Sequence, residues 1–355
     1  MRNLSVSDFP PQPEAKRVED SADFLADIIG DPRKTGQRIQ AGPVLKMMYD
    51  TAMSVAMRHS GARAVLLGLD RIDLPALICH MDLVRMEGRL VHAGHSSMTI
   101  EVRCHIKPHG EREFHGGHVG FVKMVAVDEK GQPVSKIPQL EYDSPEGAIA
   151  KALAQHRQAQ LAERTAALEW IDDKSDFQLS DVLEPEQSVR YDYLHPSETT
   201  VQLKGQIISQ GAHLDGRVKG GDFLVWLDRV ATYTASQFTR NEDMITLSVN
   251  DILFRQPLHA TDRIELNSRV IHVRNHTLEV SIEITVHALN GEQYTLDPVD
   301  LLILNYGTNG GKKRITTGLK MDKADQEDLR RYIRARTRYD FWKSNPESHL
   351  MQKPH

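Results

Sequence analysis

Few residues in this chain are candidates for catalysis or ligand binding. The most promising are an acid inside one expected helix and three glycines at the starts of two expected helices. Asp228 falls within an otherwise apolar helical stripe, where a carboxylate without a partner is costly to bury, and this favours a functional role. Gly42, Gly220 and Gly221 lie where the helices should begin. Unpaired N–H groups and the positive end of the helix dipole meet there, and glycine lets a carbonyl oxygen approach the backbone. The pattern predicts a carbonyl group polarised at a helix N-terminus.

The acid and the glycines also have purely structural interpretations. The glycines could do no more than form a tight turn into each helix. Asp228 could form an ion pair with Arg229 or Arg240 at an interface between domains, since structural ion pairs give similar patterns. At the level of the sequence these alternatives stay open.

Two other polar clusters look less reactive. Histidines around Gly116 could bind a transition metal, but they lack the cysteine or carboxylate spacing of a known metal site, so we interpret them as a surface turn and expect no metal. A basic run near the C-terminus alternates with acids, which is typical of a solvated helix face. The two clusters are His105, His109, His115 and His118, and Arg330, Arg331, Arg334, Arg336 and Arg338.

The elements that must position the acid and the glycines occur twice. Residues 69–102 resemble residues 249–282 without a gap, at an offset of 180 positions. Upstream, Gly42 aligns with Gly221 at an offset of 179 positions. A period of this length excludes a solenoid and indicates a duplicated domain.

Each copy predicts one amphipathic helix followed by several strands. Apolar residues recur at helical spacing over 44–56 and over 223–234. After each helix, apolar and polar residues alternate, as they do over 99–106. The pattern predicts an α+β fold in which an antiparallel sheet packs on one central helix.

A further helix is expected between the copies, because Ser144 suits an N-cap and Pro145 suits the first helical position. A last helix is expected over 325–341. The predicted division is an N-terminal tail over 1–20, a first domain over 21–143, a connecting helix and linker over 144–174, a second domain over 175–318, and a C-terminal helix and tail over 319–355.

Composition narrows the class of protein. With 44 basic and 49 acidic side chains the net charge is −5, which argues against a nucleic-acid-binding protein. Cys79 and Cys104 are the only cysteines, so no disulfide framework is indicated and a reducing compartment is expected. Residues 1–20 lack the apolar stretch of a signal peptide, and no apolar run is long enough to span a membrane. We therefore expect a soluble, cytoplasmic protein.

Several short motifs, taken in order, resemble one family. The first copy holds Gly-Pro-Val-Leu-Lys-Met-Met-Tyr-Asp over 42–50, Gly-His-Ser-Ser-Met over 94–98 and Val-Ala-Val-Asp over 125–128. The second copy holds Gly-Arg-Val-Lys-Gly-Gly over 216–221, followed by Asp228. This set resembles the acyl-coenzyme A thioesterases of the hotdog fold over about two thirds of the chain. The resemblance implies two hotdog domains in tandem, each an antiparallel sheet wrapped on one long central helix, with active sites between them.

The same resemblance implies candidate catalytic residues. Family members carry an acid five residues before the first motif glycine of one unit, a position that Asp31 fills relative to Gly36. Three residues before the matching glycine of the other unit they carry Asn, where this chain has His213. Asp31 would act as general base toward water, and His213 would position that water or relay the proton. Asp228 matches a helical acid that acts as nucleophile or base in several members.

The resemblance also assigns binding roles. The helix-start glycines named above would donate backbone N–H groups to the thioester carbonyl oxygen. Ser96, Ser97 and Met98 would help to hold the coenzyme, although we prefer to interpret the serines as part of an ordinary strand.

Taken together, the resemblance predicts hydrolysis of acyl-CoA thioesters to free acid and coenzyme A at a site between the repeats. Coenzyme A would be part of the substrate, and no separate cofactor is expected. Two alternatives stay open, namely a hotdog-type dehydratase or hydratase acting on acyl thioesters and a non-catalytic acyl-CoA-binding protein. We also expect a role in lipid metabolism and a homo-oligomer of double units, since exposed sheet edges favour pairing.

Overall fold

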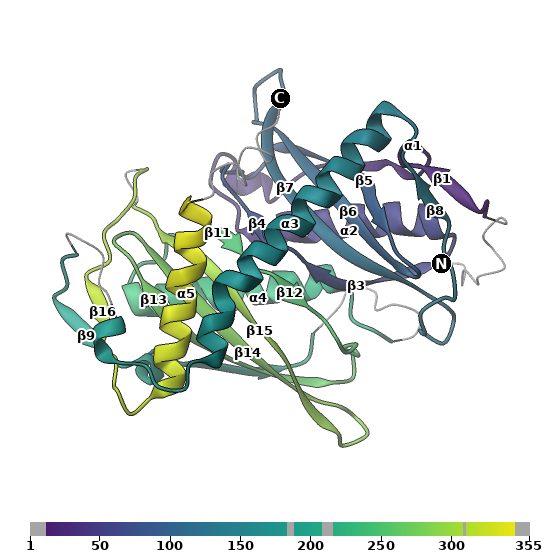
Figure 1. The fold of residues 1–355 in the computed structure, drawn as a ribbon. Coiled ribbons are helices and arrows are strands. Elements are labelled where there is room, and N and C mark those ends of the chain that lie inside the picture. The colour runs from purple at the N-terminus through teal and green to yellow at the C-terminus, as the bar shows by residue number, and fades with distance from the viewer. Residues whose placement is uncertain (1–11, 183–187, 208–215, 308–309, 345–355) are drawn as a thin grey trace.

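The computed structural model describes residues 12–182, 188–207, 216–307 and 310–344, which form an α+β fold with two copies of one element order (Figure 1). The first copy runs β2 (Asp23–Ile28), α2 (Ala41–Ser60), β3 (Arg63–Leu69), β4 (Ile72–Asp73), β5 (Leu83–Ala93), β6 (Ser97–Lys107) and β7 (His115–Val127). The second runs β10 (Val201–Gly205), α4 (Gly220–Thr239), β11 (Met244–Val249), β12 (Ile252–Leu253), β13 (Arg263–Val273), β14 (Thr277–His287) and β15 (Gln293–Asn305).

Within each copy the strands pair in the same antiparallel order. The first copy has the order β2-β5-β6-β7-β3, and the second has β10-β13-β14-β15-β11. Even an irregularity is repeated, because the register shifts between Leu90 and His92 and again between Val270 and His272. The duplication seen in the sequence therefore extends to the pairing of the strands.

The two sheets join edge to edge through the duplicated segments themselves. β4 pairs with β11 through Ile72 and Val249, and β3 pairs with β12 through Leu69 and Ile252. Gly68 permits this junction, because a Cβ there would lie 2.3 Å from the carbonyl oxygen of Ile252. One sheet of 12 strands results.

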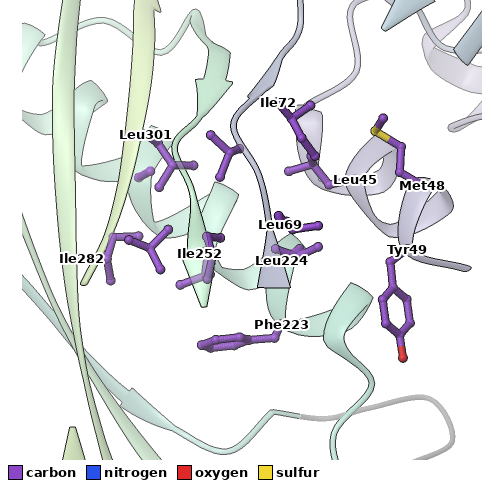
Figure 2. Packing of buried hydrophobic residues seen from close by; sticks show 14 of the residues in the cluster. Leu45, Met48, Tyr49, Leu69, Ile72, Phe223, Leu224, Ile252, Ile282 and Leu301 are labelled. Atoms are coloured by element: carbon purple, nitrogen blue, oxygen red, sulfur yellow. The ribbon is translucent and has the colours of Figure 1, made fainter. Parts of the chain in front are cut away.

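Helices α2 and α4 pack against each other on one face of the joined sheet. The apolar stripes predicted for both helices are buried in one continuous core. Figure 2 shows part of this core, with Leu45 and Met48 of α2 and Leu224 of α4 beside strand residues from both copies. Because the helices share a core, the start of each lies against the side of the other.

Two more helices, α3 (Pro145–Asp173) and α5 (Gln326–Ser344), cover the opposite face of the sheet (Figure 1). Ser144 caps α3, since its Oγ accepts the N–H of Gly147 at 3.0 Å. On α5, Arg338 is buried and pairs with Glu279 at 2.5 Å and with Asp300 at 2.7 Å. The expectation of a solvated basic face is wrong for this arginine, because acids on the sheet face it.

The remaining elements are short. In the described parts of the chain, no helix has both the length and the apolar character needed to cross a membrane. Cys79 and Cys104 are both free thiols. The short elements are β1 (Ala15–Arg17) paired in parallel with β8 (Gln139–Glu141), β9 (Asp192–Leu194) paired in parallel with β16 (Thr317–Leu319), α1 (Val18–Ser21), and the 3-10 turns Pro32–Lys34, Leu179–Asp181 and Pro196–Thr199.

Candidate active site

A carboxylate from the second repeat meets the start of the central helix of the first. Asp228 lies in α4, and its side chain is fully buried. Its Oδ2 accepts the backbone N–H of Gly42 at 2.8 Å, and its Oδ1 accepts the hydroxyl of Thr246 at 2.5 Å. These three residues define what we call the Asp228 seam. They come from α4, α2 and β11, and therefore from both repeats.

The residues that precede α2 do not cap its N-terminal N–H groups. Gln40, the N-cap residue, makes no side-chain capping bond, and Pro43 has no N–H to donate. A Cβ at Gly42 would lie 3.0 Å from the Cα of Val225 and 3.3 Å from Oδ2 of Asp228. Glycine thus lets α2 begin directly against α4. The N–H groups and the positive dipole end of α2 are therefore turned toward the carboxylate.

The surroundings of Asp228 raise its basicity. Burial raises the pKa of this carboxyl, and the hydrogen bonds from Thr246 and Gly42 offset only part of that rise. Arg229 acts on it as a nearby charge, but neither Arg229 nor Arg240 forms an ion pair with Asp228 in the described part of the chain. A carboxylate with a raised pKa is suited to general-base catalysis nearer to neutral pH.

Thr246 is a candidate site residue that sequence reasoning misses. It is buried on β11, where a β-branched residue is unremarkable from the sequence. The usable signal is the comparison of the two copies. At the offsets of the duplication, Thr246 aligns with Leu66 and Asp228 aligns with Tyr49, so the polar pair occurs in one copy only.

A cavity of about 30 Å³ adjoins the Asp228 seam. Its wall includes Gln40 and Ala41 at the start of α2, Thr246, and His118 of β7. His118 is 2% exposed, and its Nδ1 has no hydrogen-bond partner among the described residues. Burial lowers the pKa of His118 to about 4, so the ring is neutral at neutral pH. The surface-turn interpretation is therefore wrong for His118, because β7 continues through it and turns it inward.

The other seam repeats this arrangement without the acid. We call it the Tyr49 seam and define it by Tyr49, Leu66 and Gly220. The N–H of Gly220 is hydrogen-bonded to the hydroxyl of Tyr49, which itself donates to the Sδ of Met53 at 3.6 Å. Burial raises the pKa of Tyr49 far above its usual range, so the phenol stays neutral. A cavity of about 360 Å³ opens beside it, and the described residues that line it include no carboxylate.

The glycine pair at the start of α4 makes room for side chains of the first repeat. A Cβ at Gly220 would lie 2.5 Å from Cδ2 of Leu66, and one at Gly221 would lie 2.8 Å from Cδ1 of Tyr49. The close approach that glycine permits is therefore used by a tyrosine ring at this seam, whereas at Gly42 it is used by a carboxylate.

The structure does not bring Asp31 into either seam. Its carboxylate accepts the N–H of Arg33 at 2.9 Å and pairs with the Arg33 guanidinium at 2.7 Å, which lowers the pKa of Asp31. None of its hydrogen bonds among the described residues reaches Asp228, Tyr49 or a helix start. His213 lies outside the described residues.

Ser96 lies in the turn between β5 and β6, and Ser97 and Met98 begin β6. The carbonyl oxygen of Ser96 accepts the N–H of Ala126 at 2.9 Å, and that of Ser97 accepts the N–H of Gly94 at 2.7 Å. Met98 is buried in the core. The backbone of this segment therefore serves the sheet, and its role toward the coenzyme stays a prediction.

One group in the described residues has the makings of a metal site, namely His195, Asp325 and Asp328, whose potential ligand atoms lie within 4.8 Å of one another. Asp328 is already paired with Arg269 at 3.2 Å. Acids at the start of a helix such as α5 are common without an ion, because they complement the helix dipole.

Comparison with known proteins identifies the family of this chain. The family model described as "Thioesterase superfamily" matches residues 215–287, which include Asp228 and Thr246. An uncharacterized acyl-CoA thioester hydrolase from Zymomonas mobilis is 32% identical over 116 residues, which cover 32% of this chain and 78% of that protein. The chain therefore belongs to the thioesterase superfamily.

Longer relatives align across both repeats. An acetyl-coenzyme A thioesterase from Mus musculus is 22% identical over 301 residues, or 83% of this chain and 52% of the relative. The chain thus spans about half the length of these curated relatives. Among solved structures, an acyl-CoA hydrolase from Bacillus cereus is similar with 23% identity and a TM-score of 0.39, covering 46% of this chain and 99% of that one.

Proposed function

We propose that the two repeats are hotdog domains in tandem and that the chain hydrolyses acyl-CoA thioesters at the Asp228 seam. Membership of the thioesterase superfamily supports the class of reaction, and the seam supports its location. The observation that carries the proposal is the buried carboxylate of Asp228, held at the N-terminus of a helix from the other repeat. Acid and carbonyl-polarising dipole meet there across the junction of the repeats.

The proposed reaction adds water to the thioester carbonyl. Asp228 takes a proton from water while the water oxygen bonds to the carbonyl carbon, and the carbonyl electrons pass to an oxyanion at the start of α2. In this step the Gly42 N–H passes from the carboxylate to the oxyanion. When the carbonyl re-forms, the C–S bond breaks and Asp228 returns the proton to the leaving thiolate. Thr246 holds the carboxylate in place through its hydroxyl.

The size of the adjoining cavity supports a short acyl group. A cavity of about 30 Å³ has room for little more than a small substituent beside the start of α2. We therefore propose that short acyl thioesters are the preferred substrates. A thiol-release assay over a series of acyl-CoA chain lengths tests this, and a maximum at long chains would contradict it.

A second candidate, a dehydratase or hydratase acting on acyl thioesters, is favoured by one observation. The neutral imidazole of His118 lines the same cavity as Thr246, and the Thr246 hydroxyl is hydrogen-bonded to the Asp228 carboxylate. A histidine and an acid together suit the removal or addition of water across a double bond. Loss of enoyl-CoA absorbance without release of thiol would support it. Release of thiol from saturated acyl-CoA would support hydrolysis, and binding with neither activity would indicate the non-catalytic alternative.

Three further parts of the proposal come from the sequence. We propose that coenzyme A enters only as part of the substrate, that the protein acts in lipid metabolism in the cytoplasm, and that double units associate into larger assemblies. The hexameric acyl-CoA thioesterase among the similar structures makes size-exclusion chromatography with light scattering the natural test of the last point.

A further inference from the structure

The two cavities beside the seams are related by the internal duplication. Both lie between the start of one central helix, the strand after the other helix, and the loop that follows the junction strands. At the offsets of the duplication, Ile39, Ala41, Ile78 and Ile245 of the small cavity correspond to Val218, Gly220, Leu258 and Val65 of the large one.

Their sizes and their chemistry differ. The cavity of the Tyr49 seam measures about 360 Å³, against about 30 Å³ beside Asp228. Sites of about 300–1,000 Å³ are typical of small-molecule binding. The larger cavity has an apolar wall that includes Val65, Leu66 and Phe254. Of the two seams, the one without the acid and the threonine therefore has more space for an acyl chain.

Among the described residues, the charged side chains that line this cavity are both arginines. Arg217 and Arg255 belong to its lining, in which the part of the chain that the structure describes contributes no aspartate or glutamate. The Arg217 guanidinium lies across the turn at Gly131 and donates to its carbonyl oxygen at 2.9 Å. Arg255 is largely exposed and forms an ion pair with Asp297, in which its Nε lies 3.3 Å from Oδ2. Guanidinium groups match carboxylate and phosphate oxygens in geometry and charge, so the polar part of a ligand here should be an anion.

In the part of the chain that the structure describes, the Tyr49 seam also lacks the polar pair of the Asp228 seam. A neutral phenol stands where the other seam has a carboxylate, and Leu66 stands where it has a threonine hydroxyl. The Gly220 N–H, which corresponds to that of Ala41 at the start of α2, is already hydrogen-bonded to Tyr49. Among the described residues, a thioester placed here would meet neither the carboxylate nor the threonine hydroxyl of the Asp228 seam.

We propose that the Tyr49 seam is a second, non-hydrolytic binding site for an amphipathic anion that carries an acyl chain. The chain lies along Val65, Leu66 and Phe254, and the anionic group lies toward Arg217 and Arg255. A free fatty acid and an acyl-CoA share this chemistry. The inference rests on the proposed function only in that it assigns turnover to the other seam.

A pair of matched variants tests the location. Val65→Trp fills the large cavity, and Ile245→Trp places the same side chain at the corresponding half-buried position beside the Asp228 seam. Decanoate and a non-hydrolysable thioether analogue of decanoyl-CoA are titrated into the full chain and both variants by calorimetry, after melting curves show that the variants fold. We expect Val65→Trp to weaken binding of at least one of these probes by about tenfold or more. Ile245→Trp should change binding of decanoate less than about twofold, because the small cavity of about 30 Å³ has no room for a ten-carbon chain.

The two probes identify the source of the acyl chain, and decanol, which lacks the anionic group, tests the role of charge. Arg217→Gln should weaken binding of the anionic probe while leaving that of decanol unchanged. The proposal is overturned if neither anionic probe binds, if Ile245→Trp rather than Val65→Trp abolishes binding, or if both variants bind like the parent chain. Because the readout is binding, a chain that releases no thiol would refute the proposed function and leave this result intact.

Discussion

Replacing Asp228 with asparagine separates a catalytic carboxylate from one that merely caps a helix. Asparagine has nearly the same shape and can still accept the Gly42 N–H, but it carries no charge and cannot act as a base. We expect Asp228→Asn to lower turnover by about 10²- to 10⁴-fold, the usual contribution of a general base. A capping role alone would leave turnover largely intact.

The same substitution has an opposite effect on stability. The pKa of Asp228 is raised by burial despite the bonds from Thr246 and Gly42, so burial of the charge outweighs the two hydrogen bonds that favour it. Each unit of such a rise corresponds to about 1.4 kcal/mol by which the ionised group destabilises the folded chain. Since the folded-state pKa lies above the unfolded one, this penalty is full above the folded pKa and disappears as pH falls toward the ordinary value of 3.8. We therefore expect Asp228→Asn to melt higher than the parent at neutral pH, with the gap closing in acid.

Thiol release from short acyl-CoA and melting temperature are the two measurements, both followed from pH 7 downward. Tyr49→Phe is the matched control, because it changes the corresponding residue at the other seam and removes a hydroxyl instead of a charge. It should leave turnover within a factor of about two. Full turnover in Asp228→Asn, together with a lower melting temperature at neutral pH, would refute the catalytic assignment and show that the carboxylate is a structural cap.

Four other predictions follow from the two seams. Thr246→Val removes a hydrogen bond to a charged group, which contributes about 1.5–3 kcal/mol, and should lower thiol release while Thr246→Ser retains most of it. Gly42→Ala places a Cβ 3.0 Å from the Cα of Val225, so α2 and α4 must separate, and chemical denaturation should show a loss of about 1–3 kcal/mol together with lower turnover. The pH profile of kcat/KM should fall in acid through a group whose pKa lies above 3.8, and Thr246→Val should move that limb to higher pH because a donor to the charged form is lost. Asp31→Ala should leave turnover within a factor of about two, since Arg33 holds this carboxylate at the surface, and a large loss would restore Asp31 as the base.

Much of the fold could be predicted because the duplication is visible in the residues. Apolar spacing at two periods is enough to locate α2, α4 and the strands after them, and the buried stripe of each helix follows from that spacing. The interior position of His118 and the buried ion pairs of Arg338 could not be predicted, because each depends on a partner element far along the chain. The histidine needs the face of β7 that turns toward the helices, and the arginine needs acids on β14 and β15.

Two residues of the candidate site could likewise be found from the sequence, but the contact between them could not. Asp228 and Gly42 stand out in the sequence because an acid in an apolar stripe and a glycine at a helix start are locally unusual. Their contact could not be deduced, since it requires residues 186 positions apart to meet where α2 begins against α4. Counting residues back from a motif gives Asp31, which the structure pairs with Arg33, and its catalytic role stays a prediction. Its position depends on a loop, and loops place side chains in ways that spacing does not determine.

Comparing the two copies is more informative than inspecting either one. The duplication places the same helix and strand positions at both seams, so a difference between the copies at these positions points to a difference in use. Asp228 and Thr246 of one seam correspond to Tyr49 and Leu66 of the other. The two differences occur together because a buried threonine hydroxyl would lack its hydrogen-bond acceptor if the carboxylate were absent. The seam with the Asp228–Thr246 pair has almost no free space, whereas the seam with Tyr49 and Leu66 has an open cavity with an apolar wall. If one seam hydrolyses the substrate and the other only binds a ligand, the binding seam needs a larger cavity and does not need the carboxylate and the threonine. The two seams differ in this way.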